Sequence, residues 1–125
     1  MVEKLADSDV DMLEINVSCP NVSAGGMSVG ADPVALANLM DRLRPLTDKP
    51  MIVKLTPNVT DITVPARAAV EHGADALSMI NTLKGMRINI RNGEPIIANV
   101  TGGVSGPDRI ADRPGRRIPH HAPCC

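Results

Sequence analysis

Short apolar runs alternate along this chain with longer stretches in which apolar residues recur every three or four positions. The runs at 12–16, 50–55 and 76–81 (MLEIN, PMIVKL and ALSMIN) predict three strands. The stretches at 32–46 and 61–72 predict amphipathic helices between those strands. Strand, helix, strand, helix and strand in this order predict an α/β fold whose parallel strands are joined by right-handed crossovers.

Both predicted helices have recognisable end signals. Asp32 can cap the first helix, and Pro33 suits its first turn. Thr60 or Asp61 can cap the second helix, and Gly73 can end it. The first helix also places its apolar side chains at helical spacing: Leu36, Leu39, Met40 and Leu43.

The segment after the third predicted strand carries turn signals. INIRNGEPII (88–97) predicts a hairpin, because Asn92-Gly93 favours a type I′ turn. ANVTGGVSGP (98–107) predicts a strand end followed by a glycine-rich turn. Such a turn can cradle a phosphate or stack its backbone against a ring, although most glycine-rich runs are simply turns.

A polar residue stands at or near the carboxyl end of each predicted strand: Asn16, Lys54 and Asn81. In a β/α barrel these ends meet on one face, where barrel enzymes build their sites. Three strands cannot close a barrel, so we expect a consecutive portion of a (β/α)8 TIM barrel. A doubly wound sheet is the alternative architecture.

Composition agrees with part of a layered structure. The 125 residues are 43% hydrophobic but include no Phe, Tyr or Trp. Because aromatic side chains usually dominate core energetics, this core must sum many smaller contributions. Such a core fits one slice of an α/β structure better than a complete free-standing domain.

Charge and cysteine usage exclude several classes of protein. A net charge of −1 and a pI near 6.3 give no sign of a nucleic-acid or membrane surface. No apolar run approaches the roughly 20 residues of a membrane span, and the first residues lack the regions of a signal peptide. The 3 cysteines do not form a disulfide framework, so we expect a cytoplasmic location. Adjacent Cys124 and Cys125 do not match zinc-ligand spacings, so we expect no metal site.

One loop concentrates polar groups around a lone thiol. In INVSCPNV (15–22), Cys19 lies between Asn16 and Asn21, directly before a proline. A lone cysteine is often just a small buried residue, but flanking amides can bind a flat polar ligand, so we favour a site. Lys54 is either a solvated strand-end lysine or the partner of an anion or an electron-rich ligand edge.

Several segments together resemble class 1 dihydroorotate dehydrogenase: EINVSCPNV, KLTPNVTDI, GAD, INTL and ANVTGGVSGP. The resemblance runs from about Val2 to Pro107, and NVSCPN with KLTPNVTDI is its most specific part. INTL and TGGVSGP are closest to the NAD-linked subfamily. The pyrimidine-reducing domain of dihydropyrimidine dehydrogenase shares much of the pattern and is the nearest alternative.

The resemblance implies an FMN-dependent oxidoreductase that converts dihydroorotate to orotate in de novo pyrimidine (UMP) biosynthesis. Cys19 matches the base that removes a proton from C5 while C6 delivers hydride to the flavin. This agrees with the chemistry of the residue, because a thiol needs only modest tuning to act as a base near neutral pH.

The same resemblance implies ligand-binding roles. Lys54 matches the lysine at the isoalloxazine edge, where positive charge stabilises the anion of the reduced flavin. Ile80 matches a backbone contact to FMN, and Gly106 matches a flavin-contacting glycine. The implied substrate ligands are Asn16, Asn21, Asn81 and Thr82, and the implied cofactor ligands are Asn16, Lys54, Ile80 and Gly106.

Partners are also implied by the resemblance. They are an electron-transfer subunit carrying FAD and an iron–sulfur cluster, with NAD as acceptor, in a homo-oligomer or heterotetramer.

The resemblance stops near Pro107. We expect residues 1–107 to form a partial barrel domain, and residues 108–125 to be a disordered Arg- and Pro-rich tail that looks like sequence from a shifted reading frame. Family segments that supply a substrate lysine and the glycine pair for the FMN phosphate have no counterpart here. We therefore expect the isolated chain to be marginally stable, prone to associate and inactive. The alternative function is that of a non-catalytic fragment.

Overall fold

The computed structural model describes residues 1–18 and 28–106. The chain divides into two compact units, Met1–Asn81 and Thr82–Cys125, and each is described here by itself.

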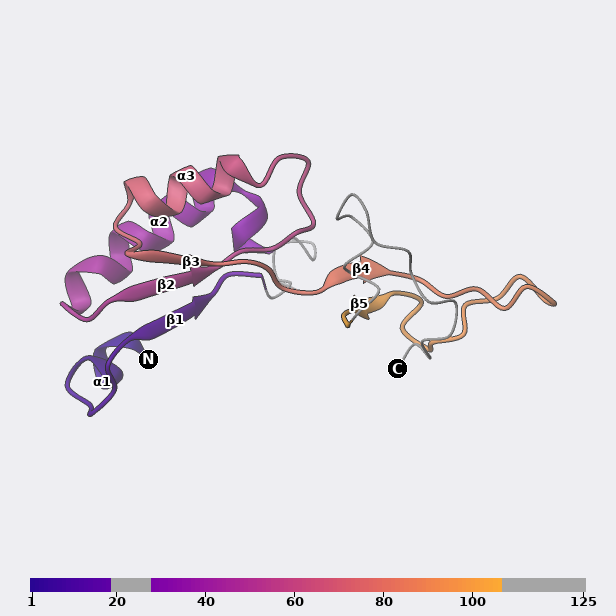
Figure 1. The fold of residues 1–125 in the computed structure, drawn as a ribbon, viewed down its shortest axis with the longest axis horizontal. Helices are drawn as coiled ribbons and strands as arrows, with labels where there is room; N and C mark the ends of the chain where they lie inside the picture. Colours follow the sequence, from indigo (N-terminus) through magenta and orange to yellow (C-terminus); the bar gives the residue numbers. More distant parts are fainter. Residues whose placement is uncertain (19–27, 107–125) are drawn as a thin grey trace. The chain divides into compact units, whose positions relative to one another are not determined.

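The first unit is built on a three-stranded parallel sheet (Figure 1). Its strands are β1 (Leu13–Asn16), β2 (Met51–Lys54) and β3 (Ala76–Ser78), in the order β1-β2-β3. Leu13 pairs with Met51 and Asn16 with Lys54, so the first two strands end together. The predicted strands and their parallel direction are confirmed, although β3 ends at Ser78, before the predicted limit.

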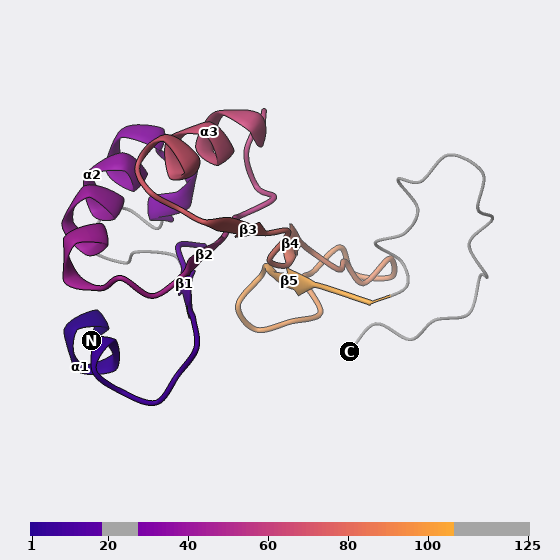
Figure 2. The same ribbon diagram turned by 60° about the vertical axis from the view of Figure 1, so that its left-hand side comes forward.

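Two helices cover one face of this sheet (Figures 1 and 2). They are α2 (Pro33–Leu43), which continues into the short η3 (Arg44–Leu46), and α3 (Thr63–Glu71). Both agree with the predicted helices at 32–46 and 61–72. The sequence did not predict the five-residue α1 (Val2–Ala6) or the short η2 (Val29–Ala31).

The core lies between the sheet and these two helices. Leu36 and Met40 of α2 meet Met51 and Val53 of β2, and all four side chains are fully buried. The rest of the buried cluster is Val17, Leu55 and Ala69, with Leu39 and Leu43 packed against it. This confirms the predicted apolar face of the first helix.

Helix ends follow the sequence signals, with one adjustment. The Asp32 carboxylate accepts hydrogen bonds from the backbone N–H groups of Val34 (2.9 Å) and Ala35 (3.3 Å), as predicted. The N-cap of α3 is Ile62, so the predicted cap at Thr60 or Asp61 is wrong in position. Asp61 nevertheless accepts from the Thr63 N–H at 2.8 Å, because its short side chain closes the turn that leads into the helix.

The amino end of the sheet is tied together by an ion pair. Arg44 Nη1 lies 2.9 Å from Asp75 Oδ2, and the same oxygen accepts the Met51 N–H at 2.8 Å. These contacts hold the pKa of Asp75 below its usual value, chiefly through the Met51 hydrogen bond. Gly73, with φ of +95°, lets the chain turn beside Arg44; a Cβ there would lie 2.8 Å from Arg44 Cδ.

The second unit is an antiparallel ribbon. It pairs β4 (Leu83–Gly85) with β5 (Gly102–Val104), and a separate bridge joins Ile88 to Pro95. The glycine-rich run predicted as a turn therefore supplies a strand, because Gly102 and Gly103 pair with β4.

The predicted type I′ turn at Asn92-Gly93 is wrong. Gly93 has φ of +74°, but among the described non-glycine residues only Val100 has a positive φ, whereas a type I′ turn needs one at Asn92 too. The Asn89 N–H instead donates to the Glu94 carbonyl at 2.8 Å, which closes a longer loop with its glycine near the end.

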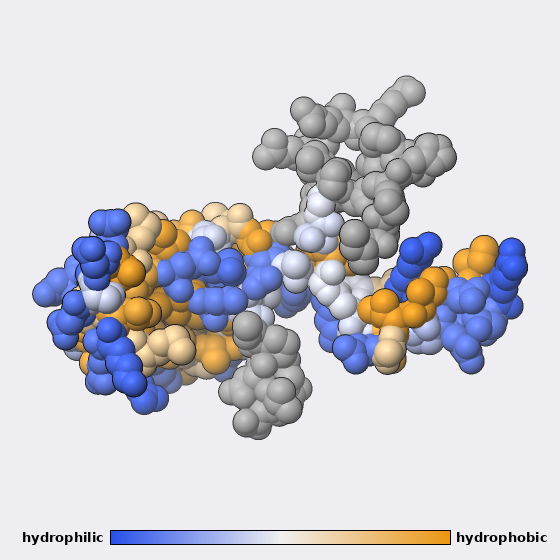
Figure 3. All heavy atoms as spheres, turned by 90° about the horizontal axis from the view of Figure 1, so that it is seen from below, coloured by the Kyte–Doolittle hydropathy of each residue, from blue (hydrophilic) through white to orange (hydrophobic). Residues whose placement is uncertain are grey.

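Apolar side chains of the second unit reach its surface. Orange atoms are visible there in Figure 3, and the exposed residues include Ile88, Ile90, Ile96 and Ile97. No residue from 82 to 106 is buried. Across residues 1–18 and 28–106, no helix has the length and apolar character needed to cross a bilayer.

Candidate active site at the carboxyl end of the sheet

A row of polar side chains crosses the carboxyl ends of the three strands. Asn16 pairs with Lys54, and Lys54 pairs with Ser78. Val53, one position earlier on β2, is part of the buried cluster, and Ile15 and Leu77, one position earlier on β1 and β3, pack against it. Because successive side chains alternate between faces, the polar row lies on the opposite face of the sheet.

Lys54 has an anionic partner on this face. Its ammonium Nζ lies 3.0 Å from Glu14 Oε1, and the two side chains are 28% and 43% exposed. The hydrogen bond from Lys54 is the largest cause that lowers the pKa of Glu14, and a bond from Ser78 acts in the same direction. Lys54 is therefore partly solvated and paired with a carboxylate of its own chain, and its predicted contact with a ligand stays a prediction.

A hydrogen-bond network joins the end of β1 to the segment after β3. Asn16 Oδ1 accepts from the Ser18 hydroxyl at 2.5 Å, from the Ser18 N–H at 3.2 Å and from Asn81 Nδ2 at 3.3 Å. Asn81 Nδ2 also donates to the Ser18 hydroxyl. The predicted meeting of Asn16, Lys54 and Asn81 at one end of the sheet is thus confirmed.

The segment that carries Ile80 and Asn81 is fixed by backbone contacts to the neighbouring strand. The Asn81 N–H donates to the Leu55 carbonyl at 3.0 Å, and the Leu55 N–H donates to the Ser78 carbonyl at 3.1 Å. The peptide between Met79 and Ile80 is cis, and the Ile80 side chain is half-buried. The two backbone hydrogen bonds with Leu55 hold this segment so that the Asn81 amide lies beside Asn16.

The thiol loop lies mostly outside the described residues. Cys19, which directly follows Ser18, and Asn21 both lie outside the described residues, so the structure does not test their predicted roles. Both flanks of the loop are tied together, because the Gly30 N–H donates to the Val17 carbonyl at 2.8 Å. A Cβ at Gly30 would lie 2.7 Å from Val17 Cγ2, so only a glycine fits this contact.

Two predicted site residues belong to the second unit. Thr82 packs closely on β5, since a Cβ at Gly103 would lie 2.5 Å from the Thr82 hydroxyl oxygen. Gly106 has φ of +110° and is exposed. The structure therefore describes their local surroundings and does not test their grouping with Asn16 and Lys54.

The sequence did not predict Glu14 and Ser78 as site residues, because both stand within apolar runs. Ser18 belongs to the polar thiol loop, but no binding role was predicted for it. In LEIN, MIVK and ALS the side chains alternate between the core and the opposite face, and this period of two could have indicated that Glu14 and Ser78 point away from the core. Strand register, however, was needed to place Glu14 within reach of Lys54.

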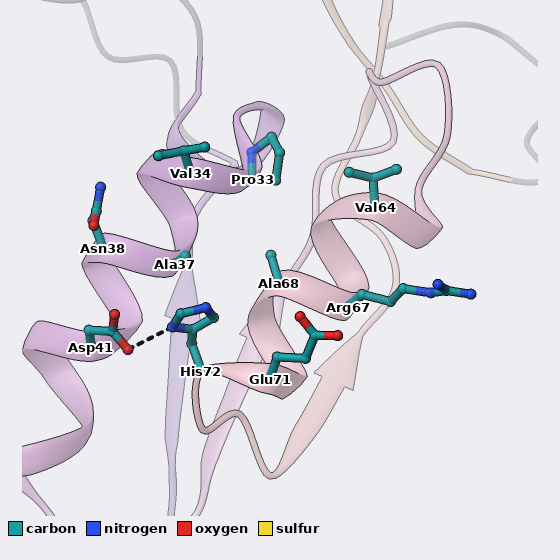
Figure 4. Close-up of a pocket in the computed structure, with 10 residues that line it drawn as sticks. All are labelled: Pro33, Val34, Ala37, Asn38, Asp41, Val64, Arg67, Ala68, Glu71 and His72. Carbon is teal, nitrogen blue, oxygen red and sulfur yellow. Dashed lines mark hydrogen bonds and ion pairs between the residues drawn. The ribbon is translucent and has the colours of Figure 1, made fainter.

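A separate groove of about 410 Å³ lies between α2 and α3 (Figure 4). In it, His72 Nδ1 lies 2.6 Å from Asp41 Oδ1. The other lining residues are Pro33, Val34, Ala37, Asn38, Val64, Arg67, Ala68 and Glu71, and none was a predicted site residue.

Comparison with known proteins gives one consistent family. The dihydroorotate dehydrogenase family model matches residues 1–115. The chain is 53% identical over 107 residues to the dihydroorotate dehydrogenase B (NAD(+)) catalytic subunit of Alkaliphilus oremlandii, and 55% identical over 107 residues to that of Alkaliphilus metalliredigens. A protein of Aquifex aeolicus that is named as a dihydroorotate dehydrogenase A (fumarate) is 54% identical over 104 residues.

These matches cover most of this chain and a smaller share of the relatives. The two Alkaliphilus alignments cover 86% of the chain and 35% of each relative, and the Aquifex alignment covers 82% and 34%. The chain thus spans about a third of the length of the curated relatives it matches.

Proposed function

This chain belongs to the dihydroorotate dehydrogenase family, and we propose on that premise that it forms part of a site that oxidises dihydroorotate to orotate with FMN. The site would serve de novo pyrimidine (UMP) biosynthesis. The observation that carries the proposal is the hydrogen-bonded group of Asn16, Ser18 and Asn81, because its member Ser18 directly precedes Cys19.

The described side chains suit a flat, polar cofactor. Asn16 and Asn81 bring amide groups to the carboxyl edge of the sheet, and the Lys54 ammonium lies on the same face beside Glu14. Amides supply both donors and acceptors, as the edge of an isoalloxazine ring requires, and a cation suits an anionic reduced ring. When bound, FMN would accept the hydride that leaves C6 of dihydroorotate.

Cys19 is the proposed base. Its sulfur would take the proton from C5 of dihydroorotate, which requires the thiolate form. Asn16 holds Ser18, the residue directly before the thiol, by accepting hydrogen bonds from its N–H and its hydroxyl.

The remaining assignments complete the proposed site. Asn16, Asn21, Asn81 and Thr82 would bind the substrate, whose planar amide-like edges suit asparagine side chains. Asn16, Lys54, Ile80 and Gly106 would bind FMN.

The wider setting is also proposed. We expect the three parallel strands to be a consecutive portion of a TIM barrel in a cytoplasmic enzyme. The names of the Alkaliphilus relatives include NAD(+) and a catalytic subunit, which favours NAD as the final acceptor and a partner subunit. We propose that this partner is the electron-transfer subunit with FAD and an iron–sulfur cluster that the resemblance implies. The Aquifex relative is equally similar and is named for fumarate. The choice of NAD as electron acceptor must therefore be tested with the electron-transfer partner present.

A non-catalytic chain that retains the site residues is the second candidate. It is favoured by the open edges of the sheet, since β1 and β3 each have a single strand neighbour within the described part of the chain. A closed barrel has no such edges.

One experiment separates these candidates. The protein is purified, supplied with FMN and mixed anaerobically with dihydroorotate, while the visible flavin absorbance is followed. In a complete enzyme that carries this loop, catalysis predicts bleaching of the flavin band, which Cys19→Ser slows by about 10²–10⁴-fold while FMN stays bound, with partial recovery at higher pH. Cys124→Ser is the matched control. Bleaching that is equally fast in Cys19→Ser would remove Cys19 from the mechanism, and no bleaching in the unaltered protein would favour the non-catalytic candidate.

A further inference from the structure

The ion pair on the polar face of the sheet connects two neighbouring strands diagonally. Glu14 of β1 pairs in register with Ile52, whereas Lys54 pairs with Asn16. Lys54 therefore reaches back along the sheet to meet Glu14, with 3.0 Å between Nζ and Oε1. The contact fixes the direction of a side chain that otherwise has four rotatable bonds.

The pair is charged under ordinary conditions. Lys54 holds the pKa of Glu14 below its usual value, so this carboxylate is ionised at neutral pH. An ammonium has three N–H donors, so one bond to Glu14 is compatible with further bonds to a ligand.

The location of the pair suggests a role beyond stability. Partly exposed ion pairs contribute little to folding, and these side chains are 28% and 43% exposed. The pair nevertheless lies beside Asn16 and Ser78, on the face of the sheet that the helices leave uncovered.

We propose that Glu14 is a positioning residue. It holds the Lys54 ammonium in a fixed direction, and its negative charge reduces the positive charge that a bound ligand experiences. The inference rests on the proposed function insofar as that ligand is FMN. With Glu14 present, Lys54 would stabilise the anionic reduced flavin less than a solitary cation would. Glu14 would thus tune the balance between oxidised and reduced flavin without touching the flavin.

The positioning half is tested without any cofactor. Lys54 is acylated with a water-soluble amine reagent, and its extent of modification is followed by peptide mass spectrometry. Glu14→Ala should increase the rate several-fold, because the ammonium loses its hydrogen-bond acceptor. Glu14→Asp, which keeps the charge on a shorter side chain, should give an intermediate rate. Glu71→Ala, an exposed position on α3, is the matched control and should not change it.

The charge half is tested on the FMN-loaded protein. Glu14→Gln keeps an oxygen acceptor but removes the negative charge, so the affinity ratio of reduced over oxidised FMN should rise roughly tenfold. Glu14→Asp should restore a ratio near that of the unaltered protein, and circular dichroism checks that each variant is folded.

Each outcome decides something distinct. Equal acylation of Lys54 in the unaltered protein and in Glu14→Ala would overturn the positioning role. An unchanged FMN ratio in Glu14→Gln would overturn the charge role. Failure of the unaltered protein to bind FMN would instead refute the proposed function, while the acylation rates would still decide whether Glu14 positions Lys54.

Discussion

The two units of this chain are ordered by different means. In Met1–Asn81, a sheet covered by two helices buries a cluster that includes Leu36, Met51 and Val53, each 0% exposed. In the described part of the second unit no residue is buried, and Ile90 is 97% exposed. The first unit is therefore stabilised by burial of apolar surface, whereas the ribbon rests on backbone hydrogen bonds.

The two units should therefore be sensitive to different substitutions. Burial is the dominant favourable term in folding, so the first unit should respond to lost packing. An isolated two-stranded ribbon is marginal in water, so changes in the second unit should leave the main unfolding transition unaffected. Matched substitutions in the two units test this contrast.

Shortening an apolar side chain should give the largest contrast. Leu36→Ala should lower the free energy of unfolding by about 2–5 kcal/mol, because the fully buried side chain leaves a cavity. Ile90→Ala should change it by less than about 0.5 kcal/mol. Urea unfolding followed by circular dichroism measures both, and a comparable loss for the two variants would show that the ribbon also contributes a core.

Glycine replacement should give the next largest contrast. Gly73→Ala should cost roughly 1–3 kcal/mol, because its φ is +95° and a Cβ would lie 2.8 Å from Arg44 Cδ. Gly93→Ala meets the same backbone restriction at φ of +74° but has no neighbour within 4 Å, so only the local loop should respond. Amide hydrogen exchange resolves the two effects. Loss of protection in the helices on Gly93→Ala would contradict the separation.

Removing one polar cap should have a smaller effect. Asp32→Ala should destabilise the first unit by about 1 kcal/mol, because two N–H groups at the start of α2 lose their acceptor. The control is Asn92→Ala, since Asn92 Oδ1 accepts from the Glu94 N–H at 3.1 Å within the ribbon loop. Its midpoint in thermal unfolding should equal that of the unaltered chain; an equal decrease in both variants would refute the distinction.

Acid should have the smallest effect, and it should act on the first unit. The pKa values of Glu14, Asp61 and Asp75 are lowered chiefly by hydrogen bonds from Lys54, Thr63 and Met51, respectively. Because the folded pKa values are below the unfolded ones, this stabilisation is present above about pH 4 and is lost as the pH falls through the folded values. Unfolding midpoints measured from pH 6 to pH 3 should fall.

The residue-level control for acid is Asp61→Asn. Removing this ionisable group should make the unfolding midpoint fall less steeply as the pH decreases, while Glu14 and Asp75 still contribute to the fall. A pH dependence identical to that of the unaltered chain would exclude Asp61 from the effect.

Local signals were sufficient for the regular elements of the first unit. Three apolar runs and two helical periods predicted the strands and helices, because burial of one stripe or face dictates these patterns. Asp32 was identified as a cap for a similar reason, since its side chain acts on the next few residues only. In the second unit the same kind of reasoning failed: Asn92-Gly93 suggested a two-residue turn, but pairing of residues 89 and 94 outside it set a longer loop.

Residue types and their periodic pattern were enough to predict side chains that are chemically suited to a site and to place Asn16 and Lys54 each at the end of a strand. The contact between Lys54 and Glu14 could be known only from the folded chain, because it depends on the register of β1 against β2. The same is true of the hydrogen bond from Asn81 to Asn16, which lies 65 positions earlier in the chain. Local propensity acts over a few residues, whereas a contact between distant residues exists only once the strands have packed in one register.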